Sequence, residues 1–241
     1  MANNNSIIHS LYYKDVAPLE QTLGLTFNDK NLLTQALVHR SFLNENRDFP
    51  LGHNERLEFL GDAVLELVVT DYLYRHYDNP EGELTNWRAS LVNSQMLAAL
   101  TSELQLEDNL YLSRGEQRDR TGKARAKILA NVFESLIGAI YLEHGYQAAE
   151  KFINDRLLVK LADILKHKLY LDPKTYFQEA AQERLSITPT YEVVHEVGPD
   201  HSKNFTVAVF LNSEKVTEGT GTSKQEAQVN AARAAIKLKG W

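Results

Sequence analysis

The feature that most constrains this chain is the run at residues 54–65, Asn-Glu-Arg-Leu-Glu-Phe-Leu-Gly-Asp-Ala-Val-Leu. At about 100° per residue, Glu55, Asp62 and Glu66 fall on one side of a helix. Glu58 lies one ridge away, and the Leu and Val residues of the run lie on the opposite side. Like charges at this spacing repel each other by about 0.2–0.5 kcal/mol per pair on an exposed helix. The acidic face is therefore either solvated surface or a site for a cation.

Two details of the run weaken the surface interpretation. Gly61 lies inside the predicted helix, where glycine costs about 1 kcal/mol relative to alanine, so we expect another backbone to approach it closely. Phe59 is a large apolar side chain beside the acids instead of opposite them. This position indicates that part of the acidic face is also covered, as a second subunit would cover it.

The composition is that of a globular protein with one large or two modest domains. The chain has 241 residues, of which 43% are hydrophobic and 24% are charged. It contains no cysteine, which excludes disulfides, thiolate zinc sites and cysteine nucleophiles and fits a reducing compartment. The first six residues are polar, and no secretory signal or membrane span is recognisable. We therefore expect a cytoplasmic protein with no membrane partner.

The formal net charge of −6 bears on the choice of partner. Residues 172–241 hold 8 Lys and Arg and 9 Asp and Glu, which leaves 18 and 23 of the totals of 26 and 32 for the rest. A protein that binds nucleic acid is expected to carry a basic surface. Here such a surface must be local, or a metal must supply the positive charge.

The pattern up to about residue 168 is helical. Apolar spacing predicts helices over residues 30–39, 55–76, 84–104, 127–142 and 148–166, with polar loops at 44–53 and 113–123. The segment 127–142 is apolar nearly all round and should form a central helix. Glu134 within it is unusual, because a buried carboxylate is rarely left unpaired. Glu134 could either form an ion pair with Lys127 or bind a metal ion.

The pattern changes after about residue 170. A helix over 172–185 is followed by strand-like segments at 190–197, 203–212 and 215–219, and a capping box at Ser223 opens a last helix to about residue 238. The predicted fold is an all-α domain at residues 1–168 followed by a small α+β domain, α-β-β-β-α, at residues 169–241.

The acids of the first domain suggest a metal. Carboxylates from two helices, with no thiol and no histidine cluster, make an oxygen site that selects Mg²⁺, Mn²⁺ or Ca²⁺ over zinc. Mg²⁺ held by carboxylates beside a phosphate is the usual arrangement for phosphodiester chemistry.

The second domain carries polar residues suited to a nucleic acid. Thr175, Gln178 and Gln182 share one face of its first helix and can bond sugar hydroxyls. His201 lies in a polar loop between strands, and Ser223 with Lys224 opens the last helix, whose positive end suits a phosphate. Each residue alone is ordinary surface, but together they indicate shape-selective binding of an RNA duplex. The loops GxxxxGK[ST] and GxGxxG are absent, so we expect no nucleotide cofactor.

Residues 54–65 resemble the signature of ribonuclease III. His39-Arg40-Ser41, Glu81-Gly82, residues 128–142 and the C-terminal module follow in the order of that family, so the resemblance covers nearly the whole chain. The C-terminal half is similar to the double-stranded-RNA-binding domain usually attached. The resemblance implies a homodimeric, Mg²⁺-dependent endoribonuclease for double-stranded RNA, in which Mn²⁺ can substitute. It also implies 5′-phosphate and 3′-hydroxyl products with staggered ends, and a role in rRNA and mRNA processing and decay.

The resemblance assigns roles by position. Glu58, Asp62 and Glu134 match metal-binding acids, and Glu55 and Glu81 match outer acids that assist metal or substrate. It also implies a dimer contact and a set of RNA contacts: Phe59 packing into the partner subunit, Thr175, Gln178 and Gln182 in the minor groove, His201 in the loop, and Ser223 and Lys224 at phosphate.

The chain departs from the family at Asn131, where the family has a metal-binding Asp. Asn keeps a carbonyl oxygen that can bind a hard cation, but it lacks the negative charge, so metal affinity should fall. An alternative function follows, that of a double-stranded-RNA-binding protein with weak or no cleavage. A third is a purely structural RNA-bound protein. The intact acids at the other positions favour the enzyme.

A second departure lies in the RNA-binding module. Gln225 and Gln228 stand where the family often has basic residues at the start of the last helix. Fewer cations release fewer counterions, so we expect weaker RNA binding and a shallower dependence on salt than in a lysine-rich relative.

Overall fold

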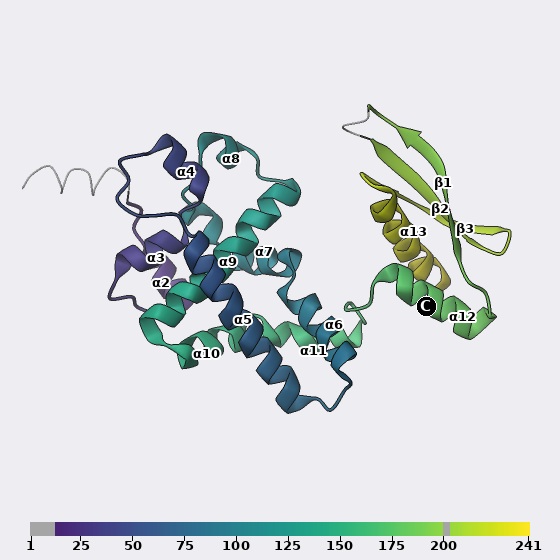
Figure 1. Cartoon of the computed structure of the whole chain (residues 1–241), viewed down its shortest axis with the longest axis horizontal. Coiled ribbons are helices and arrows are strands. Elements are labelled where there is room, and N and C mark those ends of the chain that lie inside the picture. The colour runs from purple at the N-terminus through teal and green to yellow at the C-terminus, as the bar shows by residue number, and fades with distance from the viewer. Residues whose placement is uncertain (1–12, 200–202) are drawn as a thin grey trace, which may run out of the picture. The chain divides into compact units, whose positions relative to one another are not determined.

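The computed structural model describes residues 13–199 and 203–241. The chain divides after His167 into two compact units, which are described separately. The first unit is helical, and the second contains a three-stranded sheet with two helices (Figure 1). The predicted fold class, an all-α domain followed by an α-β-β-β-α domain, is confirmed. Within the described ranges, no helix is both long enough and apolar enough to cross a membrane.

Two long helices form the centre of the first unit, α5 (Glu55–His76) and α9 (Gly122–His144). Phe133, Leu136 and Ile137 of α9 are fully buried, as expected for a helix that is apolar nearly all round. The two helices make the most extensive interhelical contact of the unit and cross in Figure 1. Helix α5 has the predicted bounds, and α9 begins five residues before the predicted start.

The two helices approach unusually closely at Gly61 and Gly138. A Cβ atom on Gly61 would lie 1.8 Å from the carbonyl oxygen of Glu134, and one on Gly138 would lie 2.3 Å from the carbonyl oxygen of Leu57. Only glycine fits at such a crossing. The close approach predicted from Gly61 is confirmed, and it places the acidic face of α5 beside Glu134.

Asn54 fixes the start of α5 in the unit. Its backbone N–H donates to the carbonyl of Val38 at 2.8 Å, and its side-chain nitrogen lies 3.4 Å from both the carbonyl oxygen of Ala36 and the hydroxyl of Ser135. Ser135, on α9, donates to the same Ala36 carbonyl at 2.7 Å. Helices α3 (Lys30–Ala36), α5 and α9 therefore share a buried polar junction that holds the acidic helix in place.

The prediction of one helix over residues 84–104 is wrong. Two helices, α6 (Glu81–Val92) and α7 (Ser94–Glu103), meet at Asn93. The side-chain oxygen of Asn93 accepts hydrogen bonds from the N–H groups of Gln95 and Met96 at 3.1 and 3.0 Å. Asparagine competes with helical backbone bonding in this way, which favours a cap over a helix interior.

Other predicted bounds also differ. The helix over 30–39 ends at Ala36, because the carbonyl of Leu37 and the N–H of His39 bond to the backbone of Tyr111. The predicted helix over 148–166 is two helices joined by a 3₁₀ turn, and the predicted loops at 44–53 and 113–123 contain part or all of short helices. The remaining elements of the unit are α2 (Ala17–Leu23), α4 (Arg40–Glu45), η1 (Leu106–Asn109), α8 (Arg114–Arg118), α10 (Tyr146–Arg156), η2 (Leu158–Lys160) and α11 (Leu161–Lys166).

The second unit packs two helices on an antiparallel sheet of order β1-β2-β3. Phe177, Val209 and Ala231 are fully buried in its core, and Gly219 allows the last helix to lie against the third strand, since a Cβ there would meet the Ala231 nitrogen at 2.1 Å. The elements are α12 (Pro173–Leu185), β1 (Thr190–Val197), β2 (Asn204–Leu211), β3 (Glu214–Gly221) and α13 (Lys224–Lys239).

The close helix crossing predicts a large effect of one methyl group. Gly61→Ala should lower the free energy of unfolding of the first unit by about 2 kcal/mol or more, because the backbone of α9 must move. Gly82→Ala is the matched control, since a Cβ on Gly82 meets nothing within 4 Å and alanine favours the helix by up to about 1 kcal/mol. Urea unfolding measures both. Equal stability of the Gly61→Ala variant and the wild type would contradict the crossing.

Candidate functional site

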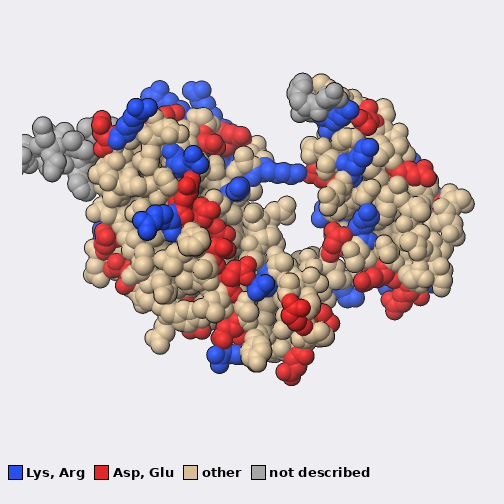
Figure 2. All heavy atoms as spheres, viewed as in Figure 1, with Lys and Arg blue, Asp and Glu red and all other residues tan. Residues whose placement is uncertain are grey.

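Carboxylates from α5 and α9 interact where the two helices cross. Figure 2 shows acidic side chains gathered over α5 on the visible face of the first unit. Burial, together with the neighbouring charges of Asp62 and Glu58, raises the pKa of Glu134 to about 7. Two acids of α5 and the one acid of α9 that the sequence singled out therefore lie within electrostatic reach of one another.

Glu58 lies at the centre of this acid cluster, which we define as Glu58, Asp62 and Glu134. Burial raises the pKa of Glu58, and the neighbouring carboxylate of Glu55 raises it as well. One carboxylate oxygen of Glu58, Oε2, is buried without a hydrogen-bond partner. Since a buried charged oxygen is costly to leave unpaired, this atom calls for a cation or a proton.

The ion pair considered for Glu134 and Lys127 is not formed. The charge of Lys127 lowers the pKa of Glu58 instead and is not among the causes that shift Glu134. The interpretation of Glu134 as half of a salt bridge is therefore wrong, and the residue remains a partly buried carboxylate beside other carboxylates.

The residues of the cluster fit a divalent cation by their chemistry. In the described parts of the chain, no three His, Asp or Glu side chains close around a common point as metal ligands do. The donors are nevertheless oxygen atoms only, one is buried and unpaired, and their mutual repulsion disfavours the charged forms. A hard cation such as Mg²⁺ would pair with the buried oxygen and offset the repulsion between the carboxylates. Glu58, Asp62, Glu134 and the carbonyl oxygen of Asn131 could hold it.

Glu55 lies at the edge of the cluster, close to the guanidinium group of Arg40 and the imidazole ring of His53. Its carboxylate is 3.5 Å from Nη1 of Arg40 and 3.7 Å from Nδ1 of His53, and its charge acts on Glu58. This position agrees with an outer acid and leaves the side chain half-exposed.

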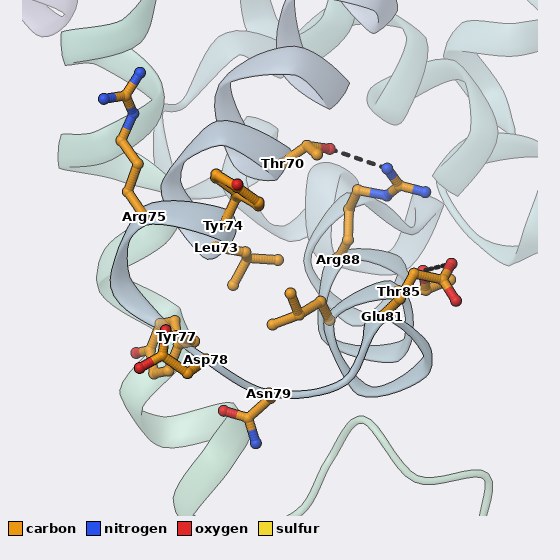
Figure 3. A pocket seen from close by; sticks show the side chains of 11 residues that line it. Thr70, Leu73, Tyr74, Arg75, Tyr77, Asp78, Asn79, Glu81, Thr85 and Arg88 are labelled. Carbon is orange, nitrogen blue, oxygen red and sulfur yellow. Dashed lines mark hydrogen bonds between the residues drawn. The ribbon is translucent and has the colours of Figure 1, made fainter.

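Glu81 is not brought to the cluster within the chain. It begins α6 and lines a pocket at the C-terminal end of α5, where the hydroxyl of Thr85 donates to it at 3.1 Å (Figure 3). Its charge is not among those that act on Glu58 or Glu134. Among the sequence-predicted acids, Glu81 is therefore the one that the described structure leaves apart.

Arg88 is a residue of this region that the sequence analysis missed. Its Nη1 donates to the hydroxyl of Thr70 at 2.9 Å (Figure 3), and its Nε lies 3.0 Å from a carboxylate oxygen of Glu66. Arg88 thus joins α6 to the acidic face of α5. An ion pair between two helices leaves no spacing pattern in the sequence, which is why it was not predicted.

Phe59 is exposed to 82%, although it is one of the largest apolar side chains of the unit. Tyr74 and Leu67 are exposed on the same side of α5. An apolar stripe of this kind on a helix indicates a surface that another molecule covers. The assignment of Phe59 to a dimer contact stays a prediction.

In the second unit, three predicted RNA contacts lie exposed on one face of α12. They are Thr175, Gln178 and Gln182, with Thr188 donating to the side-chain oxygen of Gln182 at 3.3 Å. Asp172 caps the helix through the N–H groups of Lys174 and Thr175. His201 lies outside the described residues.

Ser223 and Lys224 stand exposed at the start of α13. The hydroxyl of Ser223 accepts from the N–H of Glu226 at 3.1 Å, while Glu226 accepts from the backbone and hydroxyl of Thr222, so the predicted capping box forms in a shifted version. Nζ of Lys224 lies 5.8 Å from the ring centre of Phe205. The ammonium is thus at the end of the helix that favours anions.

Comparison with known proteins identifies the two units. A Ribonuclease-III-like family model matches residues 29–161, and a model of the double-stranded RNA binding motif matches residues 173–239. The chain is 45% identical over 219 residues to Ribonuclease 3 of Pelotomaculum thermopropionicum, which covers 90% of each chain. The chain belongs to the ribonuclease III family.

Further relatives agree with this. Ribonuclease 3 of Enterococcus faecalis is 41% identical over 221 residues, 91% of this chain and 95% of the relative. A solved structure of the nuclease domain of ribonuclease III from Campylobacter jejuni, described as showing structural flexibility in the region involved in dimer formation, matches with a TM-score of 0.52 and 41% identity. The match covers 59% of this chain and 98% of that domain. This ribonuclease III is thus an endoribonuclease with a helical nuclease domain and a double-stranded-RNA-binding domain.

Within this ribonuclease III, Asn131 takes part in the acid cluster directly. Its side chain hydrogen-bonds to Glu58 and lowers the pKa of that carboxyl group. Only the amide N–H can donate this bond, because a carboxylate accepts alone. Asn131 therefore partly neutralises the cluster, which an Asp at the same position would instead charge further.

The raised pKa of Glu134 predicts how the metal-free protein responds to pH. The carboxyl group titrates near 4.5 when unfolded and near 7 when folded, so between these values the folded state binds more protons. The free energy of unfolding should therefore fall between pH 5 and 8, by on the order of 2 kcal/mol for this group.

Glu134→Gln isolates this contribution. In chelator, urea unfolding of the variant should show a flatter pH dependence than the wild type, while the contributions of other groups, such as His39 with its burial-lowered pKa, cancel in the difference. Identical slopes for the two proteins would show that Glu134 is not held in this environment.

Proposed function

We propose that the acid cluster of the nuclease domain hydrolyses phosphodiester bonds of double-stranded RNA with a divalent metal. The observation that carries the proposal is the electrostatic coupling of Glu58, Asp62 and Glu134 across the α5–α9 crossing, with a buried, unpaired oxygen on Glu58. Such carboxylates are stable as a charged group only with a cation among them. Membership of the ribonuclease III family supports the same reaction.

The residues take the following roles in the proposal. Glu58, Asp62 and Glu134, with the carbonyl oxygen of Asn131, hold Mg²⁺, for which Mn²⁺ can substitute. When bound, the metal supplies an activated water and neutralises charge on the attacking and leaving oxygens. Water adds to phosphorus, the bond to the 3′ oxygen breaks, and that oxygen takes a proton, so the products carry 5′-phosphate and 3′-hydroxyl groups.

The outer acids serve the substrate side of the site. Glu55 is held between Arg40 and His53 at the edge of the cluster, which suits a group that orients water or ligands without binding metal directly. Glu81 lies about 10 Å along α6 from Arg88, toward the C-terminal end of α5. We propose that Glu81 acts on RNA that extends along α5 beyond the cluster.

The proposal extends to assembly and cellular role. The nuclease domain is residues 1–168 and the RNA-binding domain residues 169–241. Two chains pair through Phe59 and cut opposite strands, which leaves staggered ends. The RNA-binding domain holds the duplex through the residues predicted from the sequence: Thr175, Gln178, Gln182, His201, Ser223 and Lys224. We propose that the enzyme acts in the cytoplasm, in rRNA and mRNA processing and decay.

The decisive experiment compares the wild type with Asn131→Asp on a long RNA duplex in Mg²⁺ and in Mn²⁺. The Asp variant should cleave faster at limiting metal, because the site gains a charged ligand. Its metal-free form should be less stable, because the hydrogen bond to Glu58 is replaced by repulsion.

The cleavage rates of the two proteins distinguish the enzyme from the alternative RNA-binding protein. Equal cleavage rates would show that Asn131 does not impair the enzyme. If the wild type binds duplex without cutting and Asn131→Asp cuts, the chain is an RNA-binding protein with impaired cleavage. If neither protein cuts while both bind, the proposal that the acid cluster cleaves RNA fails.

The proposed dimer has its own test. Phe59→Ala should shift the protein from dimer to monomer in sedimentation at micromolar concentration, since a large buried aromatic anchor contributes several kcal/mol to an interface. Leu238→Ala, at an exposed apolar residue of the RNA-binding domain, is the control and should leave the dimer intact. A wild type that sediments as a stable monomer would rule out the Phe59 contact.

A further inference from the structure

Lys174 connects the two helices of the RNA-binding domain. Its ammonium group, at the start of α12, donates to the side-chain oxygen of Gln228 on α13 at 2.8 Å. The same Nζ atom lies 5.1 Å from the ring centre of Tyr191 on β1. A lysine from the first helix therefore brings its positive charge to the surface of the second helix.

Lys174 brings its ammonium group to Gln228, a position on α13 where this chain has no positive charge. Gln228 stands where the family often has a basic residue, and it lies four residues, one helical turn, after Lys224 on the same face of α13. The Lys174 ammonium is thus about one turn from the backbone position of Lys224. Thr175, the next residue on α12, belongs to the predicted RNA-contacting face.

We propose that Lys174 contacts a phosphate of the RNA duplex and supplies from α12 the positive charge that Gln228 does not. The inference rests on the proposed RNA-binding function of this domain. It assigns to Lys174 a binding role that neither the sequence pattern nor the family resemblance gave it.

The surroundings of Lys174 suit this role. An ammonium group has three donors, and the bond to Gln228 uses one, which leaves two for phosphate oxygens. The contacts with Gln228 and Tyr191 hold the long side chain in one conformation, so less conformational freedom is lost when RNA binds. Asp172, the acid two residues before it, directs Oδ1 to the N–H groups of Lys174 and Thr175. Among the described residues, no ion pair joins the Asp172 carboxylate to the Lys174 ammonium, although the charge of Asp172 does act on Tyr191 beneath it.

This assignment changes the expectation for RNA affinity. Gln225 and Gln228 together predicted the loss of two phosphate contacts and a correspondingly shallow salt dependence. With Lys174 in place of a basic residue at 228, only the charge at Gln225 is lost, so the salt slope should be steeper by about one unit than the two glutamines imply.

The test measures duplex affinity of the full chain from 50 to 200 mM salt in chelator, which prevents cleavage. Lys174→Gln removes the charge and keeps a donor for Gln228. It should weaken binding and flatten the log–log salt slope by about 0.9, so the wild type loses about threefold more affinity than the variant over this range. Lys174→Arg should retain both affinity and slope, because it keeps the charge.

Moving the positive charge from residue 174 to residue 228 tests the inference most directly. Lys174→Gln combined with Gln228→Lys returns one ammonium to the same place from the other helix, and should restore the affinity and the slope. Lys237→Gln, in the exposed last turn of α13, is the matched control and should change neither. Circular dichroism and thermal unfolding confirm that each variant is folded.

The outcomes separate this inference from the function on which it rests. If Lys174→Gln lowers only the melting temperature and leaves affinity and slope unchanged, Lys174 is a structural contact and the inference is overturned. A folded swap variant that fails to restore the slope overturns it as well. If Lys224→Gln also leaves binding unchanged, the proposed RNA surface itself fails.

Discussion

The close contact of the α5 and α9 backbones is the constraint on which the nuclease domain depends. Gly61 and Gly138 permit it, because any side chain at either position would overlap the carbonyl group opposite. The contact brings the acidic face of α5 against Glu134 in the middle of an otherwise apolar helix. The burial of α9 stabilises the crossing, and the polar junction around Asn54 and Ser135 fixes its register. The acid cluster therefore lies on two rigid helices instead of on loops, which suits a site that must hold ligands in one geometry.

This arrangement concentrates charge that the folded chain alone does not neutralise. Burial and repulsion raise the pKa of Glu134 to about 7, and Glu58 keeps one unpaired buried oxygen. Groups of this kind occur where function opposes stability. Asn131 moderates the conflict by donating a hydrogen bond to Glu58. Asn131 thus has two effects: it lowers the repulsion among the acids when no metal is bound, and it makes the set of metal ligands weaker. An Asp at this position would have the opposite effect on both.

The sequence predicted those parts of the structure that local patterns determine. Residue periodicity predicted the bounds of α5, the apolar character of α9 and the α-β-β-β-α order of the second domain. Gly61, a glycine inside a predicted helix, predicted the close approach of another backbone. Residue periodicity failed at Asn93, where one side chain divides a helix, and at the short helices that surrounding contacts stabilise. The ion pair of Arg88 with Glu66 and the bond of Lys174 to Gln228 were also out of reach. These join residues 22 and 54 positions apart, and such pairs are determined by packing rather than by spacing.

The central claim is that Glu58 and Asp62 of α5 and Glu134 of α9 form one metal site across the crossing. Anomalous diffraction from crystals grown with Mn²⁺ tests it most directly, because the signal locates the ion independently of activity. We expect a peak about 2–2.5 Å from carboxylate oxygens of both helices, with the carbonyl oxygen of Asn131 beside it. Manganese bound to α5 alone, or only at acids outside the cluster in a protein that cleaves RNA, would contradict the account.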